Sequence, residues 1–125
     1  MTKSYEKDIQ LLIKILQNQD RIKKVIKDFK CTEHNLINNE YAFDLCALYM
    51  SQIGEAAKYL TDSTKESFVK FDYKSTSKFR DLIDHIYEKV NRNVLKAYIF
   101  SMAKSEVTTE IKNRITYCRV NKRNK

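Results

Sequence analysis

The sequence predicts an all-α fold, an antiparallel bundle of four to five helices. Three features of the 125 residues support this prediction: proline is absent, glycine occurs once, and apolar residues recur at three- and four-residue steps. Strands and their turns normally need more glycine and proline than this, whereas that spacing is typical of amphipathic helices. Since the hydrophobic share of 42% is enough for one core, we expect residues 1–125 to form a single domain.

The first two expected helices are long. Residues 4–29 carry an apolar stripe, and the polar segment Gln17-Asn18-Gln19-Asp20 that interrupts it is interpreted as a place where the helix extends beyond its neighbours. Residues 39–60 follow, with Asn38 or Asn39 as the N-cap. Their apolar face is broad enough for a central helix, and it consists of Tyr41, Leu45, Leu48, Tyr49, Ile53, Ala56, Ala57 and Leu60.

Gly54 lies in the middle of this second helix, where glycine costs about 1 kcal/mol relative to alanine. A single glycine at such a position indicates that another backbone approaches closely. The neighbouring Glu55 and Lys58 are interpreted as surface charges or interface partners rather than as catalysts.

Three further helices are expected over residues 64–71, 76–90 and 93–118, and a basic tail is expected from about residue 118. The chain from Lys112 onward carries six cations and no acid: Lys112, Arg114, Arg119, Lys122, Arg123 and Lys125. Such a tail either adds salt-sensitive attraction for phosphates or only keeps the chain soluble, and the sequence leaves both open.

The net charge of +8 favours a polyanionic partner such as RNA, DNA or an acidic protein surface.

No apolar run approaches the ~18 residues of a membrane span, and the first residues lack the apolar part of a signal peptide. Cys31, Cys46 and Cys118 are widely spaced and odd in number, which indicates reduced thiols, with Cys46 in the core. We therefore expect a cytoplasmic protein without a membrane partner. No metal and no cofactor are expected, because metal-binding and phosphate-loop motifs are absent.

The chemistry is concentrated in the fourth expected helix, within Phe79-Arg80-Asp81-Leu82-Ile83-Asp84-His85-Ile86-Tyr87-Glu88. At about 100° per residue, Arg80, Asp84 and Tyr87 share one helical face, and Asp81 and His85 share another. In the simplest interpretation, Arg80–Asp84 and Asp81–His85 are surface pairs worth a few tenths of a kcal/mol.

A functional interpretation uses the same residues for phosphate chemistry. The Arg80 guanidinium would stabilise phosphate oxygens, and the His85 imidazole, with an unperturbed pKa near ~6.5, would transfer a proton. Asp81 would orient His85, and Tyr87 would contact the substrate. However, Arg80 and His85 lie about 140° apart on a regular helix. The two groups converge only if the helix is distorted or if the long Arg80 side chain bends round, and a second subunit across a two-fold axis could also supply the missing half. One chain alone is interpreted as half a site.

Arg80-Asp81-Leu82-Ile83-Asp84-His85-Ile86-Tyr87 resembles the R-x4-H-x-Y motif of HEPN-domain proteins, specifically the HepT-like toxins. Ser51-Gln52-Ile53-Gly54-Glu55-Ala56-Ala57-Lys58-Tyr59-Leu60 is similar to the I-G-E-A-A-K segment of the same family. The order of the helices also agrees, so the resemblance covers nearly the whole chain.

The resemblance implies a helical bundle that forms a homodimer and acts as a metal-independent endoribonuclease toxin of a toxin–antitoxin pair. Arg80 and His85 would be catalytic in attack by the ribose 2′-hydroxyl, with Asp81 orienting the site. A cognate MntA-like nucleotidyltransferase would neutralise the toxin by attaching AMP to Tyr87. The chain departs from the family pattern at Asp81, where many members have Asn, and at Ile86, where the residue is often Gly or Glu.

Two other functions remain open from the sequence. The chain could be a non-catalytic helical scaffold that binds a minimal nucleotidyltransferase, in which case the free protein would cleave no RNA. It could also be a basic RNA-binding protein whose affinity lies in the tail, in which case deletion of the residues after Val120 would abolish binding.

Overall fold

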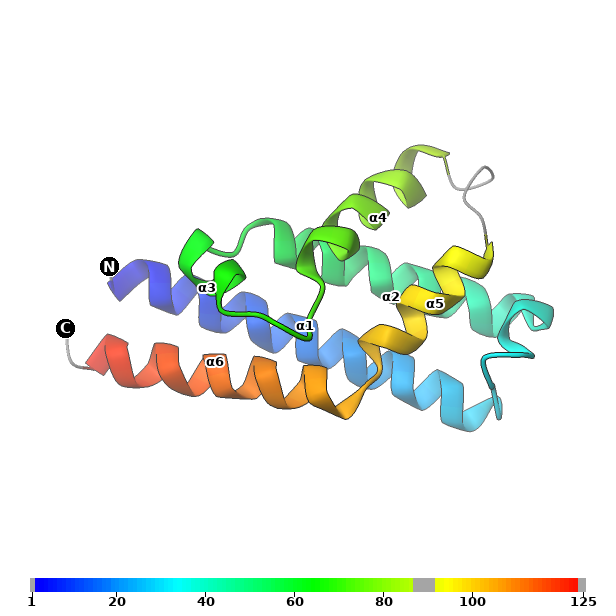
Figure 1. Ribbon diagram of the computed structural model, residues 1–125, viewed down its shortest axis with the longest axis horizontal. Coiled ribbons are helices and arrows are strands. Elements are labelled where there is room, and N and C mark those ends of the chain that lie inside the picture. The colour runs from blue at the N-terminus through cyan, green and yellow to red at the C-terminus, as the bar shows by residue number, and fades with distance from the viewer. Residues whose placement is uncertain (1, 87–91, 124–125) are drawn as a thin grey trace.

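The computed structural model describes residues 2–86 and 92–123, without the side chains of residues 2–3, 79, 81–86 and 123. No strand occurs in this part of the chain, so the predicted all-α class is confirmed. The elements, shown in Figure 1, are α1 (Thr2–Asp28), the short 3-10 helix η1 (Leu36–Asn38), α2 (Glu40–Lys58), α3 (Asp62–Glu66), α4 (Tyr73–Ile86), α5 (Arg92–Met102) and α6 (Ser105–Arg123).

The three longest helices, α1, α2 and α6, lie side by side, and α1 runs in the opposite direction to both α2 and α6 (Figure 1). α2 packs against α1 and α4, and α1 also packs against α6. Large side chains of α1, α2, α5 and α6 that are fully buried contribute to the core: Leu12, Ile15, Ile22, Phe43, Met50, Ile53, Leu95, Ile99 and Ile111. α2 is therefore the central helix, as predicted, and it supports α4, which carries the motif.

The buried face of α2 differs from the predicted one. Tyr41 and Leu48 are 65% and 51% exposed, whereas Phe43, Cys46 and Met50 are fully buried. The prediction for Tyr41 and Leu48 was wrong because α2 has apolar residues almost all around its axis, so that periodicity alone does not select the side that faces α1 and α4. Burial of Cys46 agrees with its predicted place in the core.

Side chains at the helix starts fix the boundaries. The Asn39 side chain accepts a hydrogen bond from the Ala42 N–H, which confirms the predicted cap of α2. Thr61 caps α3 in the same way, and Asp72 accepts from the Ser75 N–H at the start of α4. These caps make α3 and α4 begin at Asp62 and Tyr73, a few residues before their predicted starts at 64 and 76.

The predicted last helix over 93–118 was wrong, because it is broken into α5 and α6 at residues 103–104. The break exposes the Met102 carbonyl, which the buried side chain of Gln19 in α1 satisfies. Its Nε2 donates to the Met102 carbonyl at 2.8 Å and to the Lys104 carbonyl at 3.4 Å, and its Oε1 accepts from Thr108. The polar segment around Gln19 is therefore a buried contact with the α5–α6 corner, not a place where α1 extends beyond its neighbours.

Glu110 on α6 organises the connection between α3 and α4. Its carboxylate accepts hydrogen bonds from the backbone N–H groups of Val69, Lys70 and Phe71 at 2.8 to 3.0 Å. α3 ends at Glu66, so these residues lie beyond the helix, although residues 64–71 were predicted to be helical. Partial burial raises the pKa of Glu110, but the three backbone hydrogen bonds to its charged form outweigh burial and lower the pKa overall.

Replacement of Glu110 by glutamine is expected to reduce the free energy of unfolding by about 1–2 kcal/mol at pH 7. Because the pKa of Glu110 is lowered in the folded state, its contribution is present above the unfolded pKa and is lost as the pH falls through the folded pKa. Urea denaturation between pH 7 and pH 3 should therefore show the wild type and Glu110→Gln converging in acid. Glu106→Gln, which removes an exposed carboxylate from the same helix, is the control. An equal deficit at every pH would contradict the prediction.

Candidate functional site

The two stretches that carry the family resemblance pack against each other. Gly54 of α2 faces the first half of α4, where a Cβ atom built on Gly54 would lie 2.5 Å from the Arg80 Cβ and 2.5 Å from the Thr76 carbonyl oxygen. Neither contact can be relieved by rotating a flexible side chain. The predicted close approach of another backbone at Gly54 is therefore confirmed, and the approaching helix is the one that carries Arg80.

Gly54→Ala is expected to destabilise the protein by up to about 2 kcal/mol, because a clash of up to about 3 kcal/mol exceeds the gain in helix propensity of about 1 kcal/mol. Thermal and urea unfolding measure the net effect. In the absence of the close approach, helix propensity alone would make the alanine variant more stable than the wild type. An increase in stability would therefore contradict the contact between α2 and α4.

The residue after Gly54 holds the motif arginine. Arg80 Nη2 lies 2.7 Å from Glu55 Oε2, and the Arg80 and Glu55 side chains are 24% and 38% exposed. Glu55 Oε2 is shielded from solvent, and it makes no other hydrogen bond within the described part of the chain. Glu55 is thus more than a surface charge, because it fixes one end of the guanidinium at the junction of α2 and α4. The sequence had paired Arg80 with Asp84, whose side chain lies outside the described residues.

The other predicted site residues are placed only in part. α4 is α-helical through Ile86, so the backbones of Asp81 and His85 belong to the same helix as Arg80. The register of this helix separates Arg80 from His85 by about 140° around its axis. The side chains of Asp81 and His85, and the whole of Tyr87, lie outside the described residues. The structure adds to the predicted site a contact from Glu55 to Arg80.

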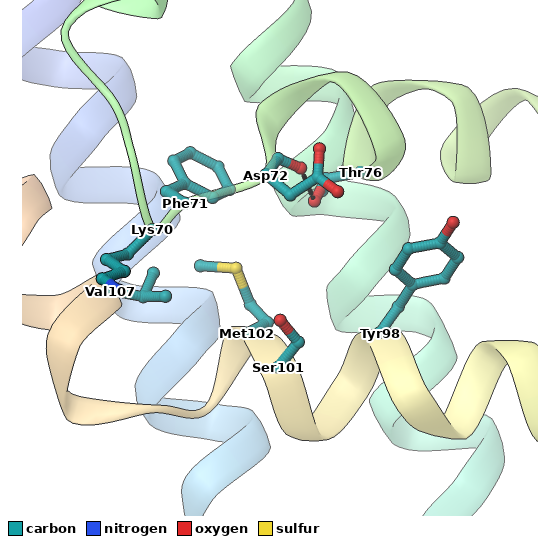
Figure 2. A pocket seen from close by; sticks show the side chains of 8 residues that line it. All are labelled: Lys70, Phe71, Asp72, Thr76, Tyr98, Ser101, Met102 and Val107. Atoms are coloured by element: carbon teal, nitrogen blue, oxygen red, sulfur yellow. Dashed lines mark hydrogen bonds between the residues drawn. The ribbon is translucent and has the colours of Figure 1, made fainter.

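A small cavity lies beneath the first turn of α4, where the α3–α4 connection meets the α5–α6 corner (Figure 2). Its volume is about 10 Å³, room for about one water molecule. The residues around it are Lys70, Phe71, Asp72, Thr76, Tyr98, Ser101, Met102 and Val107. Arg80 does not line this cavity, and its volume excludes a nucleotide. The cavity therefore belongs to the packing that fixes the start of α4.

The cysteines are poor nucleophiles. All three are free thiols, as predicted from their number and spacing, and all three are buried, which was predicted for Cys46 alone. Burial raises the pKa of Cys46 to about 12, and it also raises the pKa of Cys31 and of Cys118. A thiolate is therefore disfavoured at neutral pH. Within residues 2–86 and 92–123, no group of three or more His, Cys, Asp or Glu side chains is placed to bind a metal ion.

None of the helices in the described ranges combines the length and apolar character needed to cross a membrane. Comparisons with protein-family models, with curated proteins and with solved structures found no match to this chain.

Proposed function

We propose that the chain is a HEPN-like, metal-independent endoribonuclease, the toxin of a toxin–antitoxin pair. The observation that carries this proposal is the packing of the I-G-E-A-A-K stretch on the R-x4-H stretch. Gly54 lets α4 approach, and Glu55 fixes the Arg80 guanidinium. Two motifs that were recognised separately in the sequence thus meet at one place in the fold. Such a contact is expected if both motifs belong to one functional unit.

In the proposed reaction, the 2′-oxygen of a ribose attacks the adjacent phosphorus while His85, as general base, takes the proton of the 2′-hydroxyl. The bond from phosphorus to the 5′-oxygen breaks, a protonated imidazole gives a proton to that leaving oxygen, and a 2′,3′-cyclic phosphate remains. Arg80 stabilises the negative charge that grows on the phosphoryl oxygens. Since no step needs a metal ion, cleavage should persist in EDTA.

The proposed active form is a homodimer built from two antiparallel bundles. The separation of about 140° between Arg80 and His85 around α4 supports this part of the proposal, because one helix directs the two groups apart. A two-fold axis near α4 would bring the histidine of one protomer toward the arginine of its partner. Each protomer would then contribute a general base or acid at the shared site.

The proposed antitoxin is an MntA-like nucleotidyltransferase that transfers AMP to Tyr87. The phenol oxygen would form the new bond to the α-phosphorus of ATP, and pyrophosphate would leave. The added phosphate is negative and the adenosine is bulky, so RNA would be repelled electrostatically and blocked sterically.

The test is incubation of total RNA with purified protein in EDTA, followed by analysis of the RNA ends. The proposal expects cleavage that leaves 2′,3′-cyclic phosphates, and intact mass spectrometry of the same sample reports whether Tyr87 carries AMP. Absence of cleavage by protein that is folded, dimeric and unmodified would refute the nuclease function.

The second candidate function is the non-catalytic scaffold that binds a nucleotidyltransferase. The ion pair between Arg80 and Glu55 supports it, because a guanidinium already paired with a carboxylate is less available to phosphate. This function expects a stable complex with the nucleotidyltransferase and no RNA cleavage by the unmodified protein alone.

A further inference from the structure

A surface pocket of about 390 Å³ lies between the second half of α1 and the end of α5, away from the Glu55–Arg80 contact. Each wall contributes three residues. The spacing i, i+3 and i+4 places those of α1 on one side of that helix, and the other three lie at the end of α5 and in the turn that follows it. The wall residues are Lys23, Ile26 and Lys27 on α1, and Phe100, Ala103 and Lys104 around the end of α5. In Figure 1 these segments are the light-blue part of α1 and the yellow-orange corner between α5 and α6.

The pocket has an apolar base. Ile26, Phe100 and Ala103 are partly buried, and they pack against the main core. Phe100 contributes an aromatic ring to the wall formed by the end of α5, next to the α5–α6 corner. Stacking on such a ring suits a flat ligand, since every nucleic-acid base has a π-face.

The rim of the pocket is cationic. Lys27 and Lys104 are exposed, and Lys23 Nζ donates a 2.8 Å hydrogen bond to Thr108 Oγ1. Thr108 in turn donates to the buried Gln19, so a chain of hydrogen bonds fixes the position of Lys23. The nearby Asp28 pairs with Lys24 at 3.1 Å. Among the described residues that line the pocket, Glu33 is the one acid, against three lysines.

The wider surroundings are basic as well. Residues 21–30 contain five cations and one acid, and residues 92–105 contain three cations and no acid. Three residues from each segment line the pocket. The positive charge here is therefore separate from the basic tail that the sequence analysis identified.

We propose that this pocket binds one nucleotide of a single-stranded RNA, with the base against Phe100 and the adjacent phosphate between the lysines. A nucleotide combines a flat apolar body with an anion, which matches the apolar base and cationic rim. The strand must be single because a base held in a duplex cannot turn toward a protein side chain. The pocket would bind a part of the RNA that does not contain the cleaved bond. Its assignment to RNA rests on the proposed nuclease function, but its binding can be measured without cleavage.

The probe is a fluorescently labelled octanucleotide of 2′-O-methyl RNA, which lacks the 2′-hydroxyl nucleophile and stays intact. Anisotropy at low salt measures its affinity for the whole protein. The double variant Lys27→Glu/Lys104→Glu is expected to bind at least about tenfold more weakly and to show a shallower salt dependence. Lys7→Glu/Lys112→Glu makes the same change in net charge at exposed positions outside the pocket, and it should cost about threefold or less. Equal losses in the two double variants would overturn the proposal.

Two further substitutions test the chemistry of the pocket. Glu33→Gln removes the acid from the rim and should raise the affinity for the probe. This effect is opposite to that of the lysine variants. Phe100→Leu keeps an apolar side chain without the aromatic ring and should weaken binding about fivefold or more. Thermal unfolding identifies variants that fail to fold. If neither Glu33→Gln nor Phe100→Leu changes the affinity for the probe, the proposed contacts are overturned.

Competition experiments distinguish the source of the nucleotide. Unlabelled octanucleotide should displace the probe at concentrations at least about tenfold lower than AMP, because several linked phosphates add attraction. If AMP displaces the probe at the same concentration as the octanucleotide, the ligand is a free nucleotide and the RNA assignment is overturned. An octaglutamate peptide that competes equally would overturn recognition of a nucleotide altogether.

These outcomes are independent of the nuclease proposal. Wild-type binding by Lys27→Glu/Lys104→Glu would refute the pocket even if the protein cleaves RNA. Pocket-dependent binding by a folded, unmodified protein that cleaves nothing would refute the nuclease function and leave the pocket in place.

Discussion

His85→Ala is expected to lower the rate of RNA cleavage by about 10²–10⁴-fold, because a positioned proton-transfer group contributes about that factor. Without the imidazole, the 2′-hydroxyl must lose its proton to water, and the leaving oxygen has no adjacent acid. Single-turnover cleavage of one defined RNA in EDTA measures the loss. Circular dichroism and gel filtration should show an unchanged fold and assembly.

His34→Ala is the matched control for this experiment, because the chain has two histidines and His34 is exposed in the loop after α1. Its removal should leave the rate within about twofold of the wild type, since a surface substitution away from the site has little effect. Arg80→Lys keeps the charge but loses the planar fork of the guanidinium, so the rate should also fall. A fully active His85→Ala protein would show that the assignment of His85 is wrong.

The part of the site that could be predicted depends on a local, steric signal. A glycine inside a helix is unfavourable unless something needs the space of its missing side chain, so Gly54 alone indicates a close approach. The identity of the approaching helix was not accessible, because periodicity specifies a face and not its partner. For the same reason, the sequence paired Arg80 with a neighbour four residues away in its own helix, whereas the fold supplies Glu55 from α2.

The part of the fold that could not be predicted depends on polar contacts between distant segments. Gln19 reaches a carbonyl 83 residues further along the chain, and Glu110 holds an N–H group 39 residues before it. In the sequence, a buried polar residue looks like an interruption of an apolar stripe, and a capping carboxylate looks like a surface charge. The break between α5 and α6 was missed for this reason, since the carbonyl freed at Met102 is satisfied from α1.

The clearest contact of this kind is made by Asp8, a carboxylate that is 1% exposed on the buried side of α1. Its Oδ1 accepts the Thr61 N–H at 3.0 Å, and its Oδ2 accepts the hydroxyls of Thr61 and Thr64 at 2.6 Å each. Arg114 on α6 donates to the same Thr64 hydroxyl at 3.0 Å. Asp8 thus ties α1 to the α2–α3 corner, and Thr64 extends the network to α6.

Asp8→Ala is expected to reduce the free energy of unfolding by about 2–4 kcal/mol, because it leaves one N–H and two hydroxyls buried without their acceptor. For a chain of this length, the loss corresponds to a fall in Tm of roughly 8–15 °C. Asp8→Asn keeps an acceptor oxygen and should lose less, whereas Asp20→Ala, at an exposed position on the same helix, should change stability by about 0.5 kcal/mol or less. Urea and thermal unfolding of the three variants measure these differences. Equal stability of Asp8→Ala and Asp20→Ala would mean that the buried network does not hold α1 to the α2–α3 corner.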